Sequence, residues 1–117
     1  PKPKARVFLA QLGDLAKKKS LKLFGEFRKN NIYVSESFGR DSVKSQLRVA
    51  DRLGSDLALI MGQKEVLDNT LILREMQSGV QETIPLEKII DEVKKRLKKI
   101  TPRTPVVLTE NNQDDLI

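Results

Sequence analysis

The stretch "LALIMG", which runs from Leu57 to Gly62, decides the fold. Its first five residues are all apolar, with none of the alternation expected of a half-buried strand. This pattern predicts a strand that is buried on both faces, as the strands of parallel sheets are in α/β proteins. What precedes and follows the strand settles which α/β arrangement it belongs to.

Two strands and two helices are predicted before this stretch. "RVFLAQL" (6–12) is a short apolar run that suits a strand, and Gly13-Asp14 suits the start of a helix. That helix has an apolar face and ends at Asn30-Asn31. "IYVSE" (32–36) is a second predicted strand, and apolar residues at helical spacing then predict a helix closed by Gly54.

The residues after Gly62 predict a hairpin and a last helix. "TLILREM" and "VQETIP" are strand-like runs joined by Gln77-Ser78-Gly79, a short glycine-containing connection. Apolar residues from Leu86 to Ile100 then recur at helical spacing. The predicted order is β-α-β-α-β-β-β-α, a three-layer α/β/α fold with a five-stranded mixed sheet and three helices. We expect one domain over residues 1–100 and an extended or disordered tail over 101–117.

Composition excludes several classes of function. The 117 residues contain no cysteine and no histidine, so disulfides, thiol nucleophiles and the usual zinc sites are excluded. No apolar run reaches the length of a membrane span, and the predicted location is the cytoplasm. The net charge of +6 is concentrated in residues 1–30, which hold nine Lys/Arg against two Asp/Glu. Such a basic region is compatible with a nucleic-acid partner.

Two chemical interpretations of the residues after the central strand are disfavoured. A phosphate-binding loop needs several glycines at the start of a helix, but Gly62 stands alone and a turn and a strand are predicted to follow it. Catalysis by Glu65 would need a second titratable partner, and the chain has no histidine or cysteine to provide one. Glu65 is therefore better explained as part of a polar edge that recognises another molecule.

An ordered set of short motifs resembles the C-terminal anticodon-binding domain of class II aminoacyl-tRNA synthetases, most of all the histidyl type. The motifs are Lys44-x-Gln46-Leu47, Ala50-Asp51-Arg52-x-Gly54, Gly62-x-x-Glu65, Thr70 and "SGVQETIPL" (78–86). The resemblance covers roughly residues 5–98.

The resemblance implies a division of labour between domains. Members of this family hold the anticodon of a transfer RNA, here tRNA-His, while a catalytic domain on the same polypeptide uses ATP and Mg²⁺. We expect that domain to be absent here, so that these residues need no cofactor and form the non-catalytic part of a histidine-tRNA ligase. A chain that starts at "PKPKARVF" is interpreted as a piece of such a parent, which the resemblance implies to be a homodimer.

The resemblance also implies site residues. Glu65 and Arg74 match positions that contact anticodon bases, and Arg40 falls near another. A carboxylate accepts from base amino or imino groups, and a guanidinium forks onto acceptors. Weaker candidates for contacts to the RNA backbone are Lys44, Arg48 and Lys18.

Each candidate also has a structural alternative. Arg74 could form a surface pair with Glu75 or Glu65, and Lys44 and Arg48 could form a solvated helix face. Gln46 and Asp51 are interpreted as packing or capping residues. Two other functions remain open: an RNA-sensing or dimerising module of an accessory protein without ligase activity, and a receiver-type signalling domain, which the lone Asp14 after the first strand disfavours.

Overall fold

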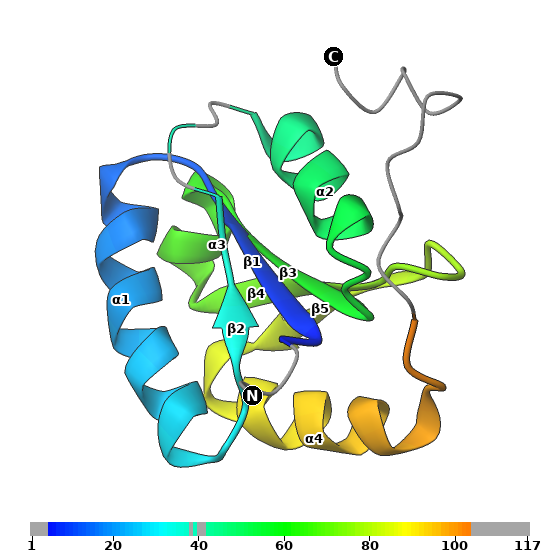
Figure 1. Cartoon of the computed structure of the whole chain (residues 1–117). Helices are drawn as coiled ribbons and strands as arrows, with labels where there is room; N and C mark the ends of the chain where they lie inside the picture. Colours follow the sequence, from blue (N-terminus) through cyan, green and yellow to red (C-terminus); the bar gives the residue numbers. More distant parts are fainter. Residues whose placement is uncertain (1–4, 38, 40–41, 104–117) are drawn as a thin grey trace.

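The computed structural model describes residues 5–37, 39 and 42–103, which form a five-stranded sheet with helices on both faces (Figure 1). The spatial order of the strands is β2-β1-β3-β4-β5. β2 and β3 run parallel to β1, whereas β4 and β5 add two antiparallel pairs. The mixed five-stranded sheet predicted from the sequence is confirmed. The strands are β1 (Val7–Gln11), β2 (Val34–Ser35), β3 (Leu57–Met61), β4 (Thr70–Glu75) and β5 (Gln81–Pro85).

β1 and β3 form the centre of the molecule. They pair in parallel from Val7 with Leu57 to Gln11 with Met61, and every residue of both strands is buried. Because successive side chains of a strand point to opposite faces, such continuous burial requires cover on both sides. The prediction that Leu57–Met61 is buried on both faces is confirmed.

The helices supply that cover. α1 (Asp14–Lys29), α3 (Gln63–Asp68) and α4 (Ile89–Lys99) contribute to the apolar core on one face of the sheet, whereas α2 (Val43–Arg52) packs on the other. Figure 1 shows α1 and α2 on opposite sides of β1 and β3. A short 3₁₀ segment, η1 (Leu86–Lys88), leads into α4. The three-layer arrangement is therefore present.

The prediction for the residues after Gly62 was wrong in one respect, because α3 replaces the expected turn. α3 has six residues and buries only Val66, so its periodicity is too short to be seen in the sequence. Its start is stabilised by Glu65, whose Oε1 accepts a hydrogen bond from the backbone N–H of Gly62 at 2.9 Å. Its end is Asn69, which adopts the left-handed conformation typical of helix C-termini.

β2 is shorter than predicted at both ends, and beyond its end a side-chain amide bonds to the edge of β1. The N–H of Gln11 donates to Oε1 of Gln46 at 2.9 Å, and Nε2 of Gln46 donates to the carbonyl of Gln11 at 2.8 Å. The N–H of the next residue, Leu12, bonds to β3, so the backbone groups of Gln11 face the β2 side. Gln46 thus occupies the place of a further β2 residue, and the chain is free to leave the sheet after Ser35.

The amino ends of β1 and β3 are joined by ionic contacts that sequence reasoning missed. The buried carboxylate of Asp56 is paired with Arg6, and it also accepts from the backbone N–H of Arg103 at 2.7 Å. The Arg103 guanidinium in turn donates to the Ser55 carbonyl and to Asp51. Residues 101–103, the start of the predicted tail, are therefore bound to the domain; residues 104–117 lie outside the described residues.

The carboxyl ends of β1, β2 and β3 form the opposite edge, the upper end in Figure 1. α1 follows β1 on one face and α2 follows β2 on the other, so the helix layer switches between the neighbouring strands β1 and β2. Open α/β sheets bind ligands outside the carboxyl ends of strands at such a switch point. Among the described residues, no helix is long and apolar enough to cross a membrane.

Candidate nucleic-acid interface

The side of β4 and β5 that faces away from α1 and α4 carries an open group of side chains. Ile72 and Arg74 of β4 pair directly with Thr83 and Gln81 of β5, and directly opposed residues project to the same face of an antiparallel pair. Thr83 and Gln81 are exposed, whereas Ile72 and Arg74 are partly buried. We call these four residues the open face. A single-stranded nucleic acid needs such a polar surface with an accessible apolar element.

The side chain of Arg74 is held on this face by a hydrogen bond to the neutral side chain of Gln81. Its Nη1 donates to Oε1 of Gln81 at 2.9 Å, and the guanidinium lies along the hairpin turn, where a Cβ added to Gly79 would be 3.5 Å from Nη2. The acceptor of this bond is Gln81, and not Glu75 or Glu65 as the surface-pair alternative required. Within the described part of the chain, no carboxylate is hydrogen-bonded to Arg74, and its remaining donors can meet a ligand.

Glu65 lies at the carboxyl edge of the sheet. One carboxylate oxygen holds the start of α3, and a Cβ added to Gly62 would be only 3.0 Å from that oxygen, so the absence of a side chain at Gly62 permits the close approach. Glu65 thus has a structural role at the start of α3 that the sequence did not reveal. Oε2 of Glu65 is not used by this bond and can accept a donor from outside.

Glu65 and Arg74 are not brought together. Arg74 is opposite Ala58 near the start of β3, whereas Glu65 follows the end of that strand at Met61. Three residues of strand separate the two levels, or roughly 10 Å at about 3.3 Å per residue. The two side chains can therefore contact different bases of an extended strand, but they cannot grip one base edge together.

The predicted backbone contacts are divided between two faces. Lys44 and Arg48 are exposed on α2, on the same side of the sheet as the open face, whereas Lys18 is exposed on α1 in the opposite layer. The α2 pair therefore shares the side of the open face, and Lys18 does not. Arg40 lies outside the described residues, so its role stays a prediction.

Beneath the open face, Arg96 of α4 fixes the strands that carry it. Its guanidinium bonds to Glu75 of β4 at 3.0 Å, to Glu82 of β5 at 2.6 Å and to Glu92 of α4 at 3.0 Å. Burial alone would lower the pKa of Arg96, but the hydrogen bonds that it donates to Glu82 and Glu92, together with their negative charges, outweigh burial and raise the pKa above its ordinary value. Ion pairs with Arg96 therefore hold β4 and β5 on the face toward α4, and these ion pairs do not involve the residues of the open face.

The carboxyl edge contains a polar chain that the sequence did not reveal. Nε2 of Gln11 donates to Oε2 of Glu36 at 2.6 Å, while the backbone of Gln11 is held by Gln46. Burial raises the pKa of Glu36, and the bond from Gln11 and the positive charge of Lys17 oppose this rise. The only sequence signal was polarity at Gln11 and Glu36, the last residues of two predicted strands.

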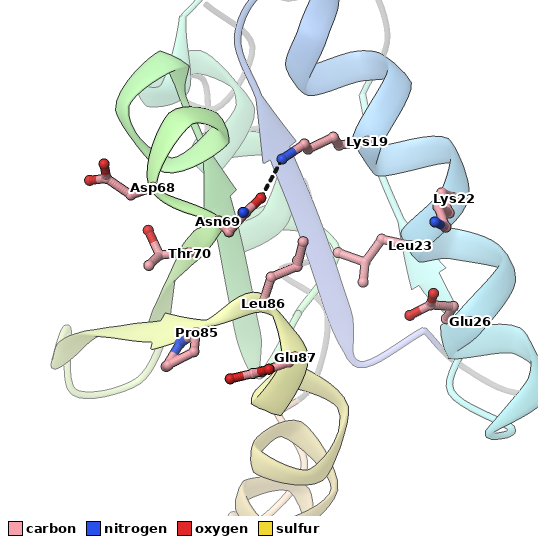
Figure 2. Close-up of a pocket in the computed structure, with 10 residues that line it drawn as sticks. All are labelled: Lys19, Lys22, Leu23, Glu26, Asp68, Asn69, Thr70, Pro85, Leu86 and Glu87. Atoms are coloured by element: carbon pink, nitrogen blue, oxygen red, sulfur yellow. Dashed lines mark hydrogen bonds between the residues drawn. The ribbon is translucent and has the colours of Figure 1, made fainter.

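A cavity of about 740 Å³ lies on the other side of the molecule between α1, the end of α3 and the end of β5 (Figure 2). Figure 2 shows Lys19 pointing across it to Asn69, and its Nζ bonds to Oδ1 of Asn69 at 2.6 Å and to the Val66 carbonyl at 3.0 Å. Its charged lining is mixed and does not favour a polyanion: Lys19, Lys22, Glu26, Asp68 and Glu87. No cluster of metal-ligating side chains occurs among the residues described.

Comparisons with known proteins agree with this geometry. A family model described as "Anticodon binding domain" matches residues 6–96. A histidine–tRNA ligase of Dehalococcoides mccartyi is 39% identical over 97 residues, which cover 83% of this chain and 23% of the ligase. The crystal structure of apo S. aureus histidyl-tRNA synthetase superposes with a TM-score of 0.70 at 28% identity, over 76% of this chain and 26% of the synthetase. That of histidyl-tRNA synthetase from Nostoc sp. PCC 7120 gives 0.75 at 26% identity, over 81% and 23%. The chain thus spans about a quarter of the length of the proteins it matches.

Proposed function

We propose that this chain, which belongs to the family of anticodon-binding domains, holds the anticodon loop of a transfer RNA on the open face and the adjoining carboxyl edge. The observation that carries the proposal is Arg74, a cation on an uncovered sheet face whose hydrogen-bond partner is the neutral Gln81. Arg74 and Glu65 lie at two levels of the sheet, so each addresses a different base of the loop.

Arg74 and Glu65, the two proposed base-contacting residues, have complementary hydrogen-bonding groups. The Arg74 guanidinium offers paired donors to acceptors such as base carbonyl and ring nitrogen atoms, whereas Glu65 offers an acceptor to amino and imino groups. Unstacked bases in a loop expose both kinds of group on their Watson–Crick edges. Lys44 and Arg48, exposed on the same side of the sheet, supply attraction to phosphates that does not depend on sequence.

The identity of the RNA and of the parent protein is part of the proposal. The relatives are named histidine–tRNA ligases, and they are about four times as long as the matched segment. We therefore assign the chain to a histidine–tRNA ligase that acts on tRNA-His in the cytoplasm as a homodimer. ATP and Mg²⁺ belong to its catalytic domain. An RNA-sensing accessory module is not favoured, because the names of the relatives support a ligase.

Substitutions that change either the charge or the hydrogen-bonding geometry, but not both, test whether Arg74 and Glu65 contact bases. Arg74→Lys keeps the positive charge but loses the fork, and Glu65→Gln keeps an acceptor for the Gly62 N–H but loses the carboxylate. Each should cost the cognate anticodon stem–loop of tRNA-His about 1–3 kcal/mol of binding free energy and narrow its advantage over loops with a changed anticodon. Fluorescence anisotropy with both kinds of RNA measures the two quantities.

Lys44→Ala is the matched control. It removes a charge on the same side of the sheet, and it should weaken both RNAs by the same factor, because a phosphate contact carries no sequence information. Variants of Arg74 and Glu65 that also leave the cognate-to-changed ratio at its wild-type value would show that the site lies elsewhere.

A further inference from the structure

We propose that Glu36 is a third base-contacting residue of the RNA site, and that it accepts hydrogen bonds from the Watson–Crick edge of a guanine. This inference rests on the proposed function, since it needs a single-stranded RNA at the carboxyl edge. It adds a residue, and a base type for that residue, which neither the motifs of the sequence nor the Glu65–Arg74 pair supplies.

The first support is the place where β2 leaves the sheet. β2 pairs with β1 only as far as Ser35 with Phe8, and the amide of Gln46 then closes the edge of β1. Glu36 is the first residue after this departure, and it is partly exposed. Its carboxylate therefore stands at the carboxyl edge of the parallel strands, where the layers switch and ligands bind in open sheets.

The second support is the rigid mounting of the carboxylate. Gln11 is only 6% exposed, and its backbone N–H and carbonyl are both bonded to Gln46, so its side chain projects from a fixed base. From there its Nε2 reaches Oε2 of Glu36 at 2.6 Å. Three elements, β1, α2 and the end of β2, thus fix one acceptor group, which is the arrangement that specific recognition requires.

The third support is the side-chain oxygen of Gln11, which the contact with Glu36 leaves unsatisfied within the described part of the chain. With Nε2 directed at Glu36, Oε1 of Gln11 is buried and has no hydrogen-bond partner among the residues that the structure describes. Leaving a buried acceptor unsatisfied is unfavourable, and such groups in native structures often mark functional sites. The opposite orientation of the amide would direct an oxygen at the carboxylate. The orientation that holds Glu36 is therefore kept at the expense of local stability.

The chemistry of the group selects the base. One oxygen of Glu36 is used by Gln11 but keeps a second lone pair, and the other oxygen is not used by this bond. A carboxylate with two available acceptor positions fits two adjacent donors. Among the four bases only guanine presents an imino and an amino donor side by side, at N1 and N2, whereas cytosine and uracil present one donor group on that edge.

Inosine tests this assignment, because it is guanosine without the N2 amino group. The probe is the fluorescently labelled anticodon stem–loop of tRNA-His, with each loop guanosine replaced in turn by inosine. For the wild-type chain, one replacement should weaken binding roughly tenfold, since each 1.4 kcal/mol corresponds to a factor of ten. In Glu36→Gln, binding of the guanosine loop should fall by a similar factor, and that same replacement should then cost less than about twofold.

Glu36→Gln retains an oxygen that can accept from Gln11, so it preserves the fold, which circular dichroism checks. Glu26→Gln is the matched control, because Glu26 is an exposed carboxylate near the far end of α1. It should keep the wild-type penalty for inosine. A Glu36→Gln variant that keeps the full penalty would overturn the role of Glu36 while Arg74 and Glu65 still discriminate between anticodons. Failure of the wild-type chain to bind any of the loops would overturn the proposed function itself.

Discussion

Partial burial of the Glu36 side chain disfavours the ionised form of its carboxylate. Burial is the largest influence on its pKa and raises it above its ordinary value of 4.5, and the opposing effects of Gln11 and Lys17 are smaller. A raised carboxyl pKa means that the folded state binds the proton more tightly than the unfolded state does. The contribution of Glu36 to stability is therefore fully present below pH 4.5 and is lost as the pH rises through the folded-state pKa.

Glu36→Gln should remove this pH dependence. As the pH is raised from about 4 to about 7, the free energy of unfolding of the variant should increase relative to that of the wild type. The reason is that only the wild type ionises a carboxylate at this position. Urea denaturation at the two pH values gives the difference in the free energy of unfolding. A difference that is constant with pH, or that favours the wild type more at pH 7, would show that burial does not disfavour the charge. Together with the inosine experiment, a gain in stability would mean that the carboxylate is kept for binding.

At the scale of elements, the edge of β1 depends on one side chain of α2. Gln46→Ala leaves the N–H and the carbonyl of Gln11 without their partners, at a cost of about 1–3 kcal/mol for each buried group. Urea denaturation should show this loss, and hydrogen exchange of the Gln11 amide should become faster. Arg48→Ala, on the exposed side of the same helix, should stay within about 0.5 kcal/mol of the wild type. Unchanged protection of the Gln11 amide would contradict this account of the short β2.

The elements also show what sequence patterns could predict. β1, β3, the hairpin and the long helices were predicted because each carries enough apolar residues to set a period of its own. α3 was missed because a helix of six residues that buries one side chain has no period to detect. β2 was predicted too long at both ends, and the tertiary hydrogen bonds by which Gln46 covers the edge of β1 beyond it have no signal in the local sequence.

The candidate site also contains residues that the sequence predicted and residues that it could not. Glu65 and Arg74 came from the resemblance, and the structure then placed them at separate levels of the sheet. Glu36 could not be inferred from local sequence, because its significance depends on contacts with residues 25 positions away on β1. The contacts of Arg103 with Asp51 and Asp56 were invisible for the same reason.

At the scale of the whole molecule, the two ends of the parallel strands have different tasks. Ion pairs around Asp56 join the first and last described segments at the amino end. Acceptors at Glu65 and Glu36 occupy the carboxyl end, and Arg74 with Gln81 lies on the open face beside β3. Binding of RNA at the carboxyl end and the open face should therefore leave the contacts of Arg6 and Arg103 undisturbed.

Anisotropy titration of the 117-residue chain with the anticodon stem–loop of tRNA-His tests the central claim most directly. A second RNA has the same stem and a changed anticodon, and both are measured at about 50 and 200 mM salt. The account predicts preference for the histidine loop at both concentrations. It also predicts roughly a tenfold loss of affinity at the higher one, as expected for two or three phosphate contacts. Equal binding of the two RNAs at both salt concentrations, or binding that salt does not change, would contradict it.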